Sequence, residues 1–211
     1  MKQEIKISVN SCVLQGTLAV PTGAVGIVIF SHGSGSSRFS PRNVFVAEKL
    51  QKAGIGTLLI DLLTQKEDEV YETRFDIDLL TKRLGAVVAW ICKEPATKDL
   101  AVGLFGASTG AASALRVAAQ LGERIAAVVS RGGRPDLAMD DLGKAVSPAL
   151  LIVGGSDFGV IELNEQAFAA LHSVKKLEIV PGATHLFEEP GALEEVARLA
   201  SDWFRTYLSA K

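Results

Sequence analysis

The chain carries a serine at the centre of a G-x-S-x-G pentapeptide, residues 106–110, with Ser108 in the middle. An apolar run at 100–105 precedes this pentapeptide, and an alanine-rich run at 111–120 follows it. That order predicts a buried strand, a sharp turn and a helix, and such a turn lifts the serine hydroxyl above the edge of a sheet. The flanking glycines are expected because side chains there would collide with the neighbouring strand and helix. Ser108 is therefore the candidate nucleophile.

A candidate base can be chosen among the three histidines, His32, His172 and His185. A serine hydroxyl is a weak nucleophile at neutral pH, so it needs a base whose ring is oriented by a third group. His32 precedes the serine in a glycine-rich loop, and His172 ends a helix on the far side of its strand. His185 follows the last predicted strand, so we predict it as the base by elimination. The alternative interpretation is a histidine of a surface loop.

The group that orients the histidine should be a carboxylate between the serine and the histidine in chain order. Asp157 follows the penultimate predicted strand and meets this condition, although it could instead cap the next helix. Three rivals, Asp136, Asp140 and Asp141, lie in the middle of a connection. Asp61 also ends a strand but precedes the serine, so we interpret it as a structural hydrogen-bonding group.

Acyl transfer also needs hydrogen-bond donors for the oxyanion that develops on the substrate. One donor would be the amide of Thr109, the residue after the candidate nucleophile. We assign the other to the amide of Ser34, in the polar loop after the third strand. In the same loop Gly33 and Gly35 are predicted to bind substrate, and His32 to brace the loop. A plain glycine-rich turn is the alternative.

Two arginines follow a predicted strand on the same side of the sheet as these groups. The guanidinium fork of Arg131 or Arg134 would suit a carboxylate or a phosphate, so we hypothesise that one of them selects an anionic substrate. The alternative is a structural arginine that holds the Gly132-Gly133 turn or pairs with Asp136.

The elements that must position these residues alternate between strand and helix. Residues 5–9 and 13–20 predict an antiparallel hairpin, with its turn at Asn10-Ser11. Further strands are predicted at 26–30, 57–60, 100–105, 125–129, 149–153 and 177–180. Helical runs lie between them, so we expect an α/β-hydrolase-like architecture: about eight mostly parallel strands with helices on both faces, in one domain over 1–211. The candidate residues all follow strands and should share one edge of the sheet.

Two connections carry further signals. Ser40-Pro41 predicts an N-cap followed by a proline in the first helical turn. The charged run at 66–69 lies in the segment Gln65–Arg74, which we interpret as a solvated loop or a lid.

Four stretches resemble α/β-hydrolases of the small, capless dienelactone hydrolase-like group. They are Ser31-His32-Gly33-Ser34-Gly35, Gly106-Ala107-Ser108-Thr109-Gly110, Gly154-Gly155-Ser156-Asp157 and Gly182-Ala183-Thr184-His185-Leu186-Phe187. This resemblance implies hydrolysis of a carboxylic ester through an acyl-enzyme, with Ser108, Asp157 and His185 as the triad. True dienelactone hydrolases use a cysteine where this chain has Ser108. That departure argues against a dienelactone substrate and favours cleavage of a general ester or thioester.

Composition excludes several other classes. Twenty-two basic and 24 acidic residues give a net charge of −2, and no basic stripe indicates nucleic acid or an anionic membrane surface. Cys12 and Cys92 lack metal-binding spacing. We find no signal-peptide core and no apolar run near the ~20 residues of a membrane span. We therefore expect a cytoplasmic monomer or homodimer that acts on a small-molecule ester, without cofactor or metal.

Two alternatives to a serine hydrolase remain. A protein with this fold could have lost turnover and act as a binding protein, because a fold does not fix a function. A dinucleotide-binding oxidoreductase is the other, because Gly103, Gly106 and Gly110 resemble a phosphate-cradling turn. Such turns usually belong to the first strand–helix unit, whereas about five strands are predicted before this one.

Overall fold

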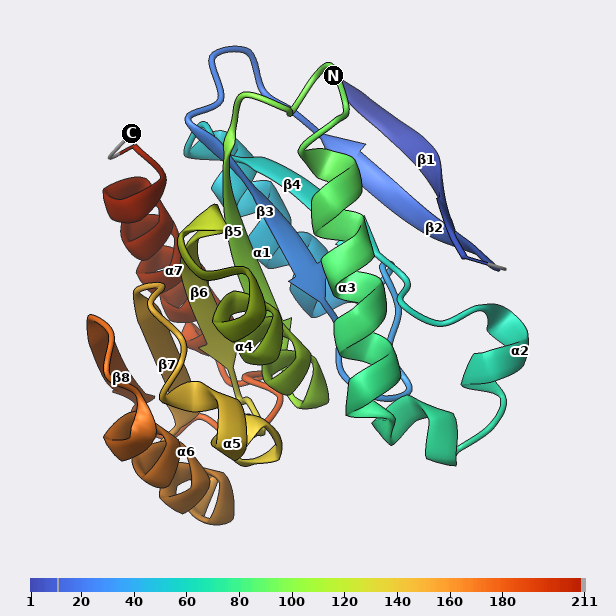
Figure 1. Ribbon diagram of the computed structural model, residues 1–211. Helices are drawn as coiled ribbons and strands as arrows, with labels where there is room; N and C mark the ends of the chain where they lie inside the picture. Colours follow the sequence, from blue (N-terminus) through green and yellow to red (C-terminus); the bar gives the residue numbers. More distant parts are fainter. Residues whose placement is uncertain (11, 210–211) are drawn as a thin grey trace.

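The computed structural model of the protein describes residues 1–10 and 12–209, and its core is one eight-stranded sheet in the order β1-β2-β4-β3-β5-β6-β7-β8 (Figure 1). The strands are β1 (Lys2–Val9), β2 (Cys12–Ala19), β3 (Gly26–Ser31), β4 (Gly56–Ile60), β5 (Ala101–Ala107), β6 (Ile125–Arg131), β7 (Ala149–Gly154) and β8 (Lys175–Val180). β2 pairs antiparallel with β1 and β4, and the other pairs are parallel. The predicted mostly parallel α/β sheet of eight strands is therefore confirmed. Ser11 of the predicted hairpin turn lies outside the described residues.

Helices cover both faces of this sheet. They are α1 (Pro41–Lys52), α2 (Gln65–Asp68), α3 (Ile77–Ile91), α4 (Thr109–Leu121), α5 (Met139–Leu142), α6 (Phe158–Ala170) and α7 (Ala192–Leu208). Short 3-10 turns are η1 (Glu72–Phe75), η2 (Gly122–Arg124) and η3 (Pro135–Ala138). Figure 1 shows α3, α4 and α5 in front of the sheet and α1 and α7 behind it. Within the described residues, no helix is both long enough and apolar enough to cross a membrane.

The two apolar layers explain why the central strands are continuous apolar runs. Val28 of β3 packs into the core shared with α1 and α7, whereas Ile29 packs into the core shared with α3 and α4. On β5, Phe105 and Leu104 divide between the same two cores. Because successive side chains point to opposite faces, a strand covered on both sides has no polar face.

Strand β6 is longer than the sequence predicts. β6 was expected to end at Val129, but it continues through Ser130 to Arg131. Arg131 pairs with Ala107 of β5 on one side and with Ile152 of β7 on the other. Both neighbouring strands extend this far, so the backbone stays hydrogen-bonded even though the side chains become polar. Arg131 is thus fixed on a central strand and does not lie in the following loop.

The charged run after β4 is more ordered than a solvated loop. Thr64 and Glu67 form a reciprocal capping box at the start of α2, a T-x-x-E signal that can be read from the sequence. Glu67 also forms an ion pair with Arg83 of α3, a residue that is only 7% exposed and whose side chain donates to the Leu62 carbonyl as well. These bonds, with the Arg83 contribution the largest, lower the pKa of Glu67 to about 2. The run is therefore anchored to α3.

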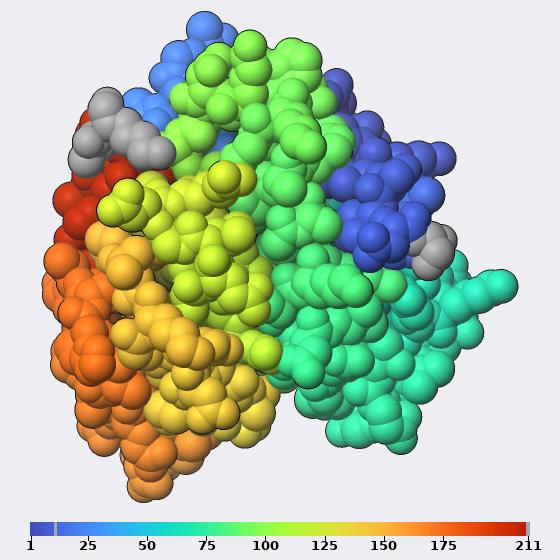
Figure 2. Space-filling view, viewed as in Figure 1, coloured from blue at the N-terminus to red at the C-terminus, as the bar shows by residue number. Residues whose placement is uncertain are grey.

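The parallel strands end at the lower edge of the sheet in Figure 1, where their connecting loops gather. Figure 2 shows an indentation at that edge, between the segment around α2 and the segment around α5. This edge is where ligands bind in open α/β sheets.

Candidate active site

Ser108 lies on the sharp turn between β5 and α4 that the pentapeptide predicts. Its backbone has φ 50° and ψ −123°, a conformation that is strained for a residue with a side chain. A Cβ on Gly106 would lie 2.4 Å from the Cα of Ala111 in α4, and one on Gly110 would lie 2.1 Å from the carbonyl oxygen of Ser31 in β3. The collisions expected with helix and strand are therefore present, and they account for both glycines.

His185 and Asp157 form a hydrogen bond. The Nδ1 atom of the imidazole lies 2.7 Å from the Oδ2 atom of the carboxylate, so Nδ1–H donates and Nε2 is left to accept a proton. Asp157 occupies the N-cap position of α6, but its side chain forms no capping hydrogen bond, which removes the capping interpretation. The rival Asp136 binds Arg134, and Asp141 binds Arg116 and Lys144.

Ser108 and His185 line the same small cavity, with a volume of about 230 Å³. The other lining residues are Gly33, Ser34, Ser36, Ser40, Arg42, Asn43, Ala107, Arg131 and Leu186. Among the described residues, the Ser108 hydroxyl has no hydrogen-bond partner, His185 included. Contacts of this kind are often long before substrate binds and tighten in the complex.

The two amides assigned to the oxyanion are in different states. Among the described residues, no acceptor binds the Thr109 amide. The Ser34 amide donates to the Thr109 side-chain oxygen at 3.0 Å, so a substrate oxygen must displace that hydroxyl to reach it. Gly33 is close to the nucleophile, since a Cβ there would lie 3.0 Å from the Cβ of Ser108. Gly35 faces Arg74 and does not line this cavity.

The loop after β3 is held by charged side chains on its other side. Asp61 accepts hydrogen bonds from the backbone amide and the guanidinium of Arg38. The His32 Nδ1–H donates to the Gly33 carbonyl at 2.9 Å, and Nε2 lies 3.9 Å from the Asp61 carboxylate. These contacts agree with the bracing role predicted for His32 and the structural role predicted for Asp61. A larger cavity of about 480 Å³ beside them contains neither Ser108 nor His185.

The two candidate arginines have different surroundings. Arg134 forms two hydrogen bonds of 2.8 Å with the carboxylate of Asp136 and does not line the cavity, as the structural interpretation expects. Arg131 lines the cavity and is only 5% exposed. It donates to the side-chain oxygen of Asn43 at 3.1 Å and lies over the Phe187 ring, with no carboxylate partner among the described residues.

Burial and the nearby Arg42 lower the pKa of Arg131 to about 10. The guanidinium is still charged at neutral pH. Sequence reasoning missed Arg42 and Asn43, because only the packing of α1 against the sheet brings them to the cavity. Among the described residues, no cluster of three or more histidines, cysteines or carboxylates could hold a metal ion.

The glycines that resemble a dinucleotide-binding turn have packing explanations. Gly106 and Gly110 allow the close approach of α4 and β3 described above. A Cβ on Gly103 would lie 2.7 Å from the Phe204 ring of α7. Close packing therefore explains the glycines at these positions without a phosphate-binding role.

Known proteins match this chain along nearly its whole length. A dienelactone hydrolase from Anabaena variabilis is 55% identical, with 99% of this chain and 98% of that chain covered and a TM-score of 0.96. Est1E from Butyrivibrio proteoclasticus is 18% identical, with 98% of this chain and 99% of that chain covered and a TM-score of 0.84, a likeness of fold alone.

Two Mycobacterium tuberculosis proteins, from strains CDC 1551 and H37Rv, are each 54% identical over 206 residues and are named "Putative phosphoribosyl transferase". The match covers 98% of this chain but 46% of theirs, so the chain spans about half the length of these relatives. The Dienelactone hydrolase family matches residues 14–209. The chain therefore belongs to the dienelactone hydrolase family, which supports a hydrolase.

Proposed function

We propose that this protein is a serine hydrolase that cleaves a carboxylic ester or thioester through an acyl-enzyme on Ser108. The observation that carries this proposal is the 2.7 Å hydrogen bond between His185 and Asp157, beside a cavity that Ser108 also lines. A histidine with its Nδ1–H held by a carboxylate presents Nε2 as a base. Family membership supports the same class of chemistry.

The proposed reaction follows from this arrangement. His185 Nε2 takes the proton of the Ser108 hydroxyl as the oxygen attacks the substrate carbonyl, and Asp157 stabilises the resulting imidazolium. The oxyanion accepts from the Thr109 amide and from the Ser34 amide, after it displaces the Thr109 hydroxyl. His185 then protonates the leaving alcohol or thiol. A water activated by the same imidazole hydrolyses the acyl-enzyme and restores Ser108.

The test is labelling by a fluorophosphonate probe, together with turnover of 4-nitrophenyl esters of increasing chain length and of matched thioesters. We expect Ser108→Ala to abolish labelling and to lower kcat/KM by about 10⁴-fold or more, because no other group supplies the nucleophile. Ser201→Ala is a matched control, since that hydroxyl lies in α7 and donates to the Ala197 carbonyl of the same helix. Unchanged labelling of the Ser108→Ala variant would defeat the assignment. If the unaltered protein shows no labelling and no turnover, the result favours a binding protein.

A further inference from the structure

Arg131 is a buried cation whose charge the fold leaves largely uncompensated. The residue is 5% exposed, and its one side-chain hydrogen bond to a described residue goes to the neutral side-chain amide of Asn43. The Nε atom is buried without a partner, and Nη1 donates to no described residue. Burying a charge without an opposite charge is costly, and proteins usually pair or coordinate such groups.

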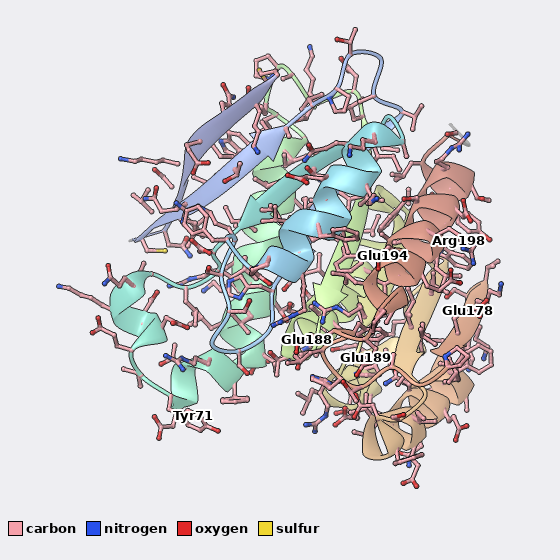
Figure 3. All side chains as sticks on the ribbon, turned by 180° about the vertical axis from the view of Figure 1, so that it is seen from behind. Tyr71, Glu178, Glu188, Glu189, Glu194 and Arg198 are labelled. Atoms are coloured by element: carbon pink, nitrogen blue, oxygen red, sulfur yellow. The ribbon has the colours of Figure 1, made fainter. Side chains whose placement is uncertain are left out.

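A second cation lies at the same end of the cavity. Arg42 lines it too, and the proximity of this guanidinium contributes to the lowered pKa of Arg131. The carboxylate that binds Arg42 is that of Glu188, at 3.0 Å, and the Glu188 side chain is 63% exposed. Figure 3 shows Glu188 beside the end of α1. An exposed pair of this kind is weak, so an incoming anion can replace Glu188.

The first turn of α1 adds polarity of the same sign. Ser40 occupies the N-cap position, but its side chain forms no capping hydrogen bond, and the first turn has no acidic residue. The backbone amides of Arg42 and Asn43 donate to no acceptor among the described residues. A helix N-terminus with free amides favours an anion, and here it faces the cavity that holds the buried Arg131.

We propose that Arg131, Arg42 and the free amides of α1 form an anion subsite, which binds a carboxylate or phosphate group of the substrate. This inference rests on the proposed function, because it places the anion beside the bond that Ser108 attacks. Arg131 pairs with Ala107, the residue before Ser108, on the neighbouring strand. A cavity of about 230 Å³ has room for the ester group and the anionic group of one small molecule. The substrate class is therefore a short ester or thioester that carries an anionic group.

Binding can be tested without turnover, by thermal unfolding of the Ser108→Ala protein at constant ionic strength. The probes are inorganic phosphate, monomethyl succinate as a carboxylate, and dimethyl succinate as its neutral match. We expect one anionic probe, at about ten times its dissociation constant, to raise Tm by about 3–5 °C, and dimethyl succinate to have no such effect. The more effective anion tells a phosphate-bearing substrate from a carboxylate-bearing one.

Two variants locate the bound anion. Adding Arg131→Met to the Ser108→Ala protein should remove the shift, and Arg42→Met provides a second route if the first variant folds poorly. Arg198→Met removes one guanidinium from the outer side of α7, away from Glu188 in Figure 3, and should leave the shift unchanged. No shift with either anion, or an equal shift after Arg131→Met and Arg42→Met, would overturn the proposal.

Kinetics give an independent readout in the protein with Ser108 intact. The 4-nitrophenyl monoester of succinic acid should have a kcat/KM about 10- to 100-fold above that of 4-nitrophenyl pentanoate, as expected for a charged hydrogen bond. Arg131→Met should remove this preference, and Arg131→Lys should restore part of it.

The two proposals fail in different ways. If the protein cleaves esters without a charge preference and no anion raises its Tm, the anion subsite is rejected and the hydrolase proposal stands. A shift without turnover or probe labelling would leave the subsite and remove the hydrolase.

Discussion

Arg83 and Arg131 are both almost fully buried, but the fold treats their charges in opposite ways. Arg83 donates to the Glu67 carboxylate and the Leu62 carbonyl, and the bond to Glu67 is the main cause of its raised pKa. Arg131 has a neutral amide, an aromatic ring and a second arginine around it, and its pKa is lowered to about 10. Arg83 forms a complete ion pair that anchors α2 to α3. Arg131 lies beside the candidate nucleophile with its charge unmatched, which is the arrangement expected of a ligand-binding group.

The sharpest test of this comparison is to remove each guanidinium in turn. We expect Arg83→Met to lower the free energy of unfolding by about 2–4 kcal/mol, because Glu67 and the Leu62 carbonyl lose their donor. We expect Arg131→Met to leave it unchanged or to raise it by about 1 kcal/mol, because an uncompensated buried charge is lost. Urea unfolding at pH 7 measures both. Equal losses would show that the surroundings of Arg131 compensate its charge as fully as Glu67 compensates Arg83.

A smaller effect is expected from the acid partner of Arg83. The pKa of Glu67 is about 2 in the folded protein against an ordinary 4.5, so this pair stabilises the fold above pH 4.5. The stabilisation is lost as the pH falls through about 2. Glu67→Gln should cost about 1–2 kcal/mol at pH 7, and the difference from the unaltered protein should shrink steadily below pH 4.5. A constant difference in urea unfolding from pH 7 to pH 3 would contradict this account.

The smallest effect on stability is expected at Arg134, the arginine that does not line the cavity. Its bonds to Asp136 lie near the surface, where ion pairs contribute about 1 kcal/mol or less. Arg134→Met should change the free energy of unfolding by no more than that, and should leave the preference for an anionic ester as it is. Loss of that preference in kcat/KM measurements would place Arg134 in the binding site after all.

Sequence reasoning succeeded where signals were local or followed from strand order. The apolar runs indicated β3 to β8 and the covered faces of the sheet. The turn around Ser108, and the proximity of Asp157 and His185, followed from placing each at the end of a strand. The alternative in which Asp157 caps a helix could be decided only from coordinates, because both interpretations place the residue at the same position.

What failed depended on packing between distant segments. The end of β6 was placed two residues early, because pairing with β5 and β7 decides how far that strand runs. Nothing near Arg131 in the sequence reveals that Asn43 and Arg42 approach it from α1. The anchoring of Glu67 depends on Arg83, sixteen residues later, and the capping-box signal with Thr64 was not used in the prediction. Choosing between Arg131 and Arg134 likewise required knowing which of them Asp136 reaches.

Gly110 has a consequence for how far the site can tolerate change. Its missing side chain lets the start of α4 lie directly against the end of β3; the amide of Thr109 comes from α4, and that of Ser34 from the loop that follows β3. Any larger residue would push the elements apart and widen the gap between the two amides that we propose as oxyanion donors. The resulting protein could keep its sheet, its histidine and its serine, yet bind the transition state poorly. One hydrogen atom in place of a methyl group thus sets the dimensions of the candidate active site.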